Sequence, residues 1–210
     1  MDNCIEFFNT FLKTELKPFM KNKNFKISGQ HFYLERDDLT AFISIEKSSW
    51  NFKDSFTFCF KATVFDKVAY KYLGEYSKIP KIPHNTLFNI IDTSVIALKS
   101  EKTDRYSLGF DSDIEEFKTT IFSHLQNILI PFVESLKTGQ DLIPIYKDAA
   151  GGFIGPGIFL DLAIGFHLLE YGDRANAIKY ITKWIKEERK RGYWNDVVDS
   201  LEQKLEKGEF

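Results

Sequence analysis

The chain is poor in the residues that carry most recognisable chemistry. Among its 210 residues are two cysteines, Cys4 and Cys59, which lie far apart in sequence. A disulfide framework normally needs more cysteines in a shorter chain, so we expect both to be reduced thiols in a cytoplasmic protein. The histidines have none of the usual metal-ligand spacings, so we predict neither a metal site nor a cofactor. The histidines are His31, His84, His124 and His167.

A strong net charge is also lacking. The 28 basic and 30 acidic side chains leave a net charge of -2, so no field of the whole protein attracts nucleic acid or an anionic membrane. The densest basic stretch, residues 183–191, is interrupted by Glu187 and Glu188. It suits a solvated face near a helix C-terminus better than a nucleic-acid site, because cations there favour the helix dipole. We therefore expect no nucleic-acid partner.

Long hydrophobic runs are absent as well. Residues 149–169 come closest to the roughly 20 apolar residues that a spanning helix needs, but they include several glycines and Asp161. A buried helix entered through a glycine-rich loop explains this stretch better, so we expect no membrane span. Residues 1–6 have no basic segment followed by an apolar run, so we expect no secretory signal.

Known catalytic motifs are missing too. The run Gly151–Gly157 lacks the Gly-Lys-Ser/Thr ending of a phosphate loop, and no strand clearly precedes it. The acidic run 111–116 lacks the glycine and the distal glutamate of an EF-hand, so helix capping explains it better. Neither a Gly-x-Ser-x-Gly elbow nor a Cys–His signature is present. We lean against an enzyme, although a triad assembled from distant residues would leave no local pattern.

What the sequence does have is clear apolar periodicity. Apolar residues over 5–19 form one stripe of a helix that Asp2 or Asn3 caps and that Pro18 bends or ends. After this helix, short alternating runs indicate strands joined by tight turns. The predicted strands cover residues 25–28, 31–36, 39–47, 55–64, 93–98 and 105–110.

A long amphipathic helix is predicted over residues 114–132. Asp111, Ser112 and Asp113 precede it and supply its cap, and Pro131 should kink it. Consecutive short strands joined by turns favour an antiparallel β-meander with one buried face. The predicted fold class is therefore α+β, with the meander packed against the N-terminal and central amphipathic helices.

The last third of the chain is predicted to be all-helical. Three helices are expected over residues 158–170, 174–190 and 194–207, and Tyr171-Gly172-Asp173 is a helix stop followed by an N-cap. We predict an α+β domain over residues 1–140. An αα-hairpin plus a terminal helix forms a helical lobe over residues 141–210, either separate or packed as one unit with the first domain.

The most distinctive polar cluster lies at the end of a predicted strand. Lys47, Ser49, Trp50 and Asn51, together with Arg105 at the start of the last strand, are the candidate ligand- or partner-binding residues. Trp with a nearby charge is a common interface anchor. The alternative is a polar turn in which Trp50 packs on the core and Asn51 bonds the local backbone.

Several short runs also occur in a characteristic order over roughly residues 1–140. They are Leu16-Lys17-Pro18, Asn24-Phe25-Lys26, Gly29, His31-Phe32-Tyr33, Glu46-Lys47-Ser48-Ser49-Trp50-Asn51, Phe56-Thr57-Phe58, Arg105 and Ile130-Pro131-Phe132. In this order they resemble a bacterial family known only as domain of unknown function 4304. The chain departs from that pattern because it lacks a Trp pair before the long helix and carries the helical lobe. The resemblance implies an α+β fold, no known activity and no catalytic residues to transfer.

The leading hypothesis is a non-catalytic protein-interaction module in which the sheet or the helical lobe binds a protein partner. One concrete form is an immunity-type protein that neutralises a toxin, a hypothesis based only on the general character of small near-neutral α+β bacterial proteins. The alternative is a small-molecule-binding protein or an undetected enzyme, with a pocket between the sheet and the long helix. A third hypothesis is self-association through the helical lobe.

Overall fold

The computed structural model describes residues 3–73, 105–149 and 160–210. The chain divides into two compact units. Unit 1 comprises Met1–Arg36, Thr40–Val64 and Ile91–Leu136, and unit 2 comprises Asp37–Leu39, Phe65–Ile90 and Lys137–Phe210. The strand predicted over 93–98, the glycine-rich run 151–157 and His84 lie outside the described residues.

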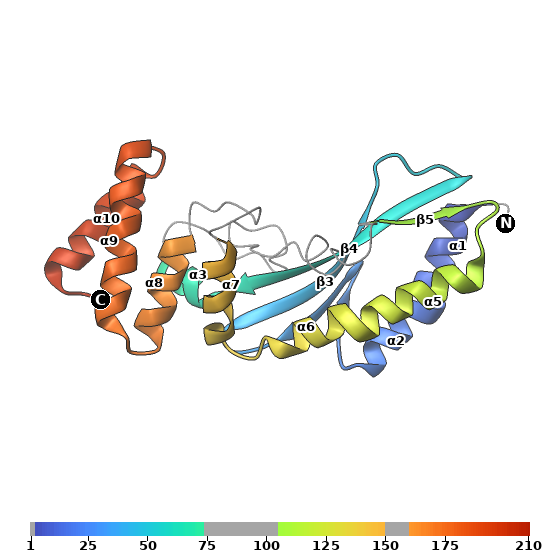
Figure 1. The fold of residues 1–210 in the computed structure, drawn as a ribbon, viewed down its shortest axis with the longest axis horizontal. Helices are drawn as coiled ribbons and strands as arrows, with labels where there is room; N and C mark the ends of the chain where they lie inside the picture. Colours follow the sequence, from blue (N-terminus) through green and yellow to red (C-terminus); the bar gives the residue numbers. More distant parts are fainter. Residues whose placement is uncertain (1–2, 74–104, 150–159) are drawn as a thin grey trace. The chain divides into compact units, whose positions relative to one another are not determined.

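Five strands form one sheet in which neighbours in sequence are neighbours in space (Figure 1). The first and second, second and third, and fourth and fifth strands pair antiparallel, with His31 opposite Ser44 and Ser55 opposite Gly109. At the first hairpin Gly29 has φ of 61°, a conformation that a two-residue turn of this kind requires. This sheet confirms the predicted antiparallel meander and the α+β class. The strands are β1 (Lys26–Ser28), β2 (His31–Glu35), β3 (Leu39–Lys47), β4 (Ser55–Asp66) and β5 (Tyr106–Gly109).

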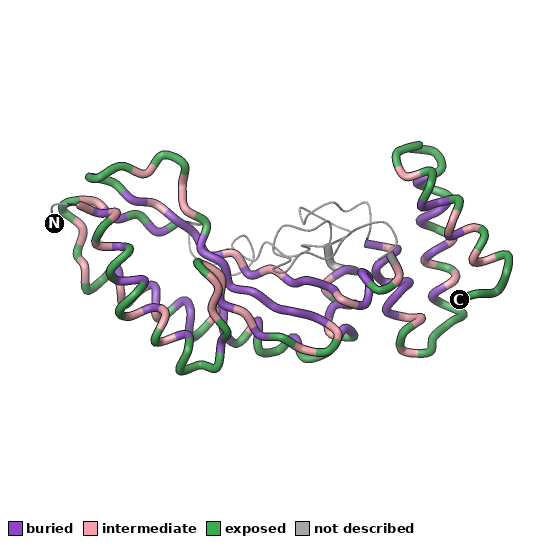
Figure 2. The backbone as a smooth tube through the Cα atoms, turned by 180° about the vertical axis from the view of Figure 1, so that it is seen from behind, coloured by how far each residue is buried: buried purple, intermediate pink, exposed green. Residues whose placement is uncertain are grey.

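The central strand β3 is buried more completely than the sequence predicted. Every residue from Leu39 to Ile45 is buried (Figure 2), although alternate side chains of a strand point to opposite faces. The expectation of a single buried face is therefore wrong for this strand. Ser44 lies on the second face and is compatible with burial because its hydroxyl lies 2.8 Å from Nδ1 of His31.

Two helical rods lie side by side on one face of the sheet in unit 1 (Figure 1). Both predicted caps are confirmed, because the side chains of Asn3 and Asp113 accept backbone amide bonds at the start of each rod. The rods also contact each other through rings such as Phe11 and Phe117. The first rod is α1 (Cys4–Phe11), η1 (Leu12–Leu16) and α2 (Lys17–Asn22), and the second is α5 (Ile114–His124), η2 (Leu125–Leu129) and α6 (Ile130–Ser135).

Both rods contain a proline that follows a π-helical turn. The amide of Lys17 donates to the carbonyl of Leu12 before Pro18, and Ile130 donates to Leu125 in the second rod. The wider turn changes the hydrogen-bond register where the proline ring would otherwise meet the preceding carbonyl. Pro18 therefore does not end the first helix, which continues to Asn22.

Phenylalanines form the core of unit 1. The Phe8 ring of α1 stacks on Phe56 of β4 at 4.4 Å between ring centroids, and Phe58 lies 4.7 Å from Phe8. Phe58 also contacts Tyr106 of β5 at 5.1 Å and Phe117 of α5 at 6.3 Å. One fully buried ring thus connects both rods and two strands, which makes Phe58 the centre of this core.

Unit 2 is mainly helical. Gly172 ends α8 with φ of 87°, and the Asp173 side chain caps α9, as the sequence predicted. Gly165 of α8 permits close helix packing, because a Cβ there would lie 2.7 Å from Cγ1 of Ile181. The sequence did not predict α7. The elements are α3 (Lys67–Leu73), η3 (Gly139–Asp141), α7 (Leu142–Ala149), α8 (Leu160–Glu170), α9 (Arg174–Arg191) and α10 (Asn195–Lys207).

In the part of the chain that the structure describes, helices are too short or too polar to cross a bilayer.

Candidate functional site

The connection between β3 and β4 is held by one side chain that the sequence singled out. Asn51 accepts the amide of Thr57 at 2.6 Å and donates to the carbonyl of the same residue at 3.0 Å. The neighbouring Phe52 exchanges backbone bonds with Ser55 at 2.8 and 3.3 Å. The loop is therefore tied to the start of β4, and the proposed local role of Asn51 as a backbone partner is present.

Exposed aromatic rings gather at this end of unit 1. Trp50 is 77% exposed, Phe52 is 58% exposed and Phe110, in the turn after β5, is 51% exposed. The backbones of Phe52 and Phe110 lie at one edge of the sheet, because Phe52 pairs with Ser55 and Ser55 lies opposite Gly109. Trp50 precedes Phe52 by two residues in the same loop. We call Trp50, Phe52 and Phe110 the aromatic end. Trp50 does not pack on the core, so that part of the polar-turn alternative is wrong.

The remaining predicted site residues lie in different places. Lys47 lies at the end of β3, where its Nζ is 3.3 Å from Oδ1 of Asn9 and within 5.6 Å of the ring centroids of Phe8 and Phe56. Burial lowers the pKa of Lys47. Ser49 is exposed in the loop. Arg105 comes directly before Tyr106, and Tyr106 pairs with Phe58 of β4. Phe58 lies several residues along β4 from the aromatic end, so the structure does not bring Arg105 to the loop.

Arg105 instead lines a groove between β5 and α5. The groove has a volume of about 420 Å³ and a mixed polar and apolar lining, with hydroxyls from Ser107, Ser112 and Thr120. At its floor the hydroxyl of Tyr106 lies 2.7 Å from Nδ1 of His124, and both side chains are buried. This is the location that the small-molecule alternative predicted, between the sheet and the long helix. A ligand there would meet hydroxyls, a carboxylate and a guanidinium.

A second cluster, which sequence reasoning missed, lies inside unit 2. The Asp66 carboxylate at the end of β4 is fully buried. It accepts hydrogen bonds from Oη of Tyr146 at 2.5 Å, Nε2 of His167 at 2.7 Å and the amide of Ala69 at 2.9 Å. Burial and the nearby Asp66 charge raise the pKa of Tyr146 far above its ordinary value, so Tyr146 remains a donor. We call Asp66, Tyr146 and His167 the buried triad.

The buried triad joins three helices of unit 2 through one carboxylate. All three side chains have zero exposure, and Asp66 is both the N-terminal cap of α3 and the common acceptor for α7 and α8. Nδ1 of His167 is buried and has no hydrogen-bond partner among the residues that the structure describes. It faces Gly139, where a Cβ would lie 2.7 Å from it. A substrate has no described route to this imidazole.

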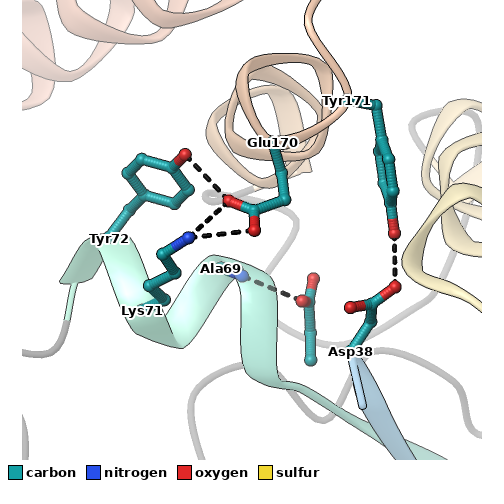
Figure 3. Close-up of polar contacts among 7 residues, drawn as sticks. Asp38, Ala69, Lys71, Tyr72, Glu170 and Tyr171 are labelled. Carbon is teal, nitrogen blue, oxygen red and sulfur yellow. Dashed lines mark hydrogen bonds and ion pairs between the residues drawn. The ribbon is translucent and has the colours of Figure 1, made fainter. Parts of the chain in front are cut away.

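A smaller polar network connects α3, α8 and the segment at Asp38 (Figure 3). Glu170 accepts two bonds from Nζ of Lys71, at 2.7 and 2.9 Å, and one from Oη of Tyr72 at 3.0 Å. Tyr171, next in sequence, donates to Asp38 at 2.6 Å. Hydrogen bonding to Lys71 lowers the pKa of Glu170, while burial and Glu170 raise the pKa of Tyr72 to about 12.

Acid should therefore weaken the link between α3 and α8. Because the folded pKa of Glu170 is below the unfolded value, its stabilisation is complete above pH 4.5 and is lost as the pH falls through the folded pKa. We expect Glu170→Gln to lower the free energy of unfolding by about 0.5–1 kcal/mol at pH 7, since Lys71 is largely exposed. Urea unfolding from pH 3 to pH 8 measures this.

The matched control is Lys71→Met, which removes the same ion pair from its other side. In a double-mutant cycle at pH 7, the second substitution should cause little further loss of unfolding free energy beyond that of the first. A Glu170→Gln effect that stays constant down to pH 3 would contradict the assigned role of the carboxylate charge.

The basic stretch of residues 183–191 forms ion pairs with neighbouring carboxylates. Arg189 of the basic stretch lies 2.7 Å from Asp199 and 2.5 Å from Glu202, and Lys183 lies 2.7 Å from Asp161. These pairs support the reading of that stretch as a solvated helix face. Within the described ranges, histidine, cysteine and carboxylate side chains do not gather in threes around a possible metal position.

Comparison with known proteins now gives the family. The model of a family described as domain of unknown function (DUF4304) matches residues 16–135. The chain belongs to the DUF4304 family. The resemblance seen in the sequence is thereby confirmed over more than half of the chain. Neither a curated protein nor a solved structure matches the chain.

The DUF4304 match includes the aromatic end, the groove and Asp66. It ends before Tyr146 and His167, so two members of the buried triad come from the helices that follow the matched region. The C-terminal helices are consistent with the helical lobe that the sequence predicted beyond the family resemblance.

Proposed function

We propose that this DUF4304 protein is a non-catalytic interaction module that binds a protein partner through the aromatic end. The observation that supports the proposal is the exposure of Trp50, Phe52 and Phe110 together at one edge of unit 1. Large apolar rings that gather on a surface mark interaction sites more often than single exposed residues do. Tryptophan is also enriched among the residues that dominate interface energies.

The backbone beneath these rings is ordered before any partner arrives. The side chain of Asn51 forms hydrogen bonds with the backbone of Thr57, and the backbone of Phe52 pairs with that of Ser55. A partner would therefore meet rings whose backbone is already positioned, which reduces the conformational entropy lost on binding. Lys47, whose charge lies beside buried rings near this loop, and exposed Ser49 belong to the same surface in our proposal.

Removal of the Trp50 ring should weaken partner binding without harming the fold. We expect Trp50→Ala to weaken partner binding by about 2 kcal/mol, or roughly 30-fold in Kd. The free energy of unfolding should change by less than about 0.5 kcal/mol, since the ring is mostly solvated. The measurements are titration calorimetry with a partner recovered from the native host by crosslinking, and urea unfolding.

Tyr193→Ala is the matched control, because Tyr193 is 78% exposed but belongs to unit 2. It should leave binding unchanged. Equal affinities of wild type and Trp50→Ala would contradict the proposed site, and failure to recover a stable partner from the host would count against an interaction module. The immunity-type form of the proposal requires in addition that the partner be a toxin whose activity the full chain suppresses.

A second candidate function is the binding of a small polar ligand in the groove. The observation that favours it is the volume of about 420 Å³ beside Arg105, lined by hydroxyls and the Tyr106–His124 pair. Its test is a screen of polar metabolites by ligand-detected NMR, in which Thr120→Trp should fill the groove and remove any signal. Persistence of the signal in that variant would exclude the groove as its source.

A further inference from the structure

Exposed carboxylates follow the rings of the aromatic end in both of its segments. Asp54 comes directly before Ser55, which lies opposite Gly109 in the sheet. The carbonyl oxygen of Asp54 is 3.9 Å from the position that a Cβ atom would take on Gly109. The turn after Phe110 then leads into the first turn of α5. Along these two segments, 50–54 and 109–116, one exposed lysine accompanies five exposed carboxylates. The residues are Lys53, Asp54, Asp111, Asp113, Glu115 and Glu116.

Among the described residues these carboxylates form no ion pair, and Arg105 lines the same groove as Asp113 and Glu116. Ion pairs among the described residues use other carboxylates, and the basic residue of α5 nearest to them, Lys118, pairs with Glu15 at 2.7 Å. One Asp113 oxygen caps α5. The local negative field is therefore directed to solvent, although the whole chain is close to neutral.

We propose that the partner of the aromatic end presents a basic surface, with lysine or arginine side chains that meet the carboxylates while apolar groups cover the rings. This inference rests on the proposed function and adds the charge of the partner to it. Complementary charge accelerates encounter and excludes wrong partners. Lysine and arginine also bind over the faces of exposed aromatic rings. The same field repels nucleic acids and anionic lipid surfaces, so the occupant is a protein.

The test uses a defined set of ligands rather than an unknown partner. A library of random 12-residue peptides displayed on phage is selected on the immobilised full chain, and enriched peptides are synthesised with a fluorescent label. We expect the enriched peptides to carry net positive charge. Their affinity, measured by fluorescence anisotropy, should fall about fivefold or more between 50 and 500 mM salt, because the Debye length falls below the charge separations.

Two variants separate the contributions of rings and charge. Trp50→Ala should remove most of the binding, and the double charge reversal Asp111→Lys/Glu115→Lys should weaken binding about tenfold or more by replacing attraction with repulsion. Neither Asp111 nor Glu115 caps α5 through its side chain, so the helix remains. Glu206→Lys makes the same kind of change on α10 in unit 2 and should leave binding unchanged.

Each outcome decides between the two claims. Basic peptides that depend on both Trp50 and the carboxylates support the inference. Enriched peptides that are neutral or acidic but still require Trp50 overturn the basic partner and leave the proposed interaction site standing. If no peptide is enriched, or if Trp50→Ala binds enriched peptides as wild type does, both the inference and the proposed site are wrong.

Discussion

Replacement of Asp66 by alanine is expected to destabilise unit 2 by about 3–5 kcal/mol, the range for removal of one partner from a buried charged network. Alanine would leave the Tyr146 hydroxyl and His167 Nε2 without an acceptor in a fully buried site. It would also remove the cap of α3, whose Ala69 amide bonds the same carboxylate. One substitution therefore removes the carboxylate that α3, α7 and α8 all bond.

Hydrogen exchange resolved by peptide is the measurement, because it reports each unit separately. Protection should fall in α3, α7 and α8 of Asp66→Ala, while α1 and β1 remain protected. Tyr146→Phe removes a single charge-assisted hydrogen bond and should lower the free energy of unfolding by less, about 1.5–3 kcal/mol. Asp199→Ala, at a largely exposed ion pair of α10, is the control and should cost no more than about 1 kcal/mol.

The opposite result has a clear meaning. An Asp66→Ala protein with wild-type protection in α7 and α8 would show that those helices are held by apolar packing alone. The buried triad would then be a consequence of the fold and not one of its causes.

Phe58→Ala should have an effect of similar size on unit 1. The fully buried ring contacts Phe8, Tyr106 and Phe117, so its removal opens a cavity beneath both helical rods. Truncation of a buried phenylalanine to alanine typically costs about 3–5 kcal/mol, through lost apolar burial and the cavity that remains. Protection of backbone amides against hydrogen exchange should fall along β4, β5 and α5.

Phe52→Ala is the matched control, because it removes the same kind of ring from an exposed position three residues before Ser55. It should change the free energy of unfolding by less than about 0.5 kcal/mol. Phe58→Leu, which keeps most of the volume, should cost about 1–1.5 kcal/mol. Equal destabilisation by Phe58→Ala and Phe52→Ala would refute the position of Phe58 at the centre of the core.

Local patterns accounted for most of the secondary structure. Asn3, Asp113 and Asp173 were predicted as caps and are caps, because capping depends on a side chain within two or three residues of the amides it bonds. Of the two outcomes predicted for Pro18, it does not end the helix, since a π-turn in the preceding residues changes the hydrogen-bond register. That turn depends on packing along the rod, and the helix propensities of its residues do not predict it. The domain boundary near residue 140 stays a prediction.

The candidate site was predicted only in part. The sequence pointed to the loop at Trp50 and to the Asn51 backbone contact, both of which lie within a few residues. It did not include Phe52 of the same loop, or Phe110, which lies near this loop because β4 pairs with β5. Arg105 was grouped with the loop, whereas strand register places it at the groove.

The sequence by itself determined the α+β class, the order of the strands, the helix caps and the DUF4304 family, because each depends on neighbouring residues or on the order of short motifs. Only the tertiary structure decided which distant groups meet. Asp66 finds its donors 80 and 101 residues away, and aromatic rings from two turns share one surface through strand pairing. Hydrogen bonding and hydrophobic burial act through space, so these contacts depend on the path of the whole chain.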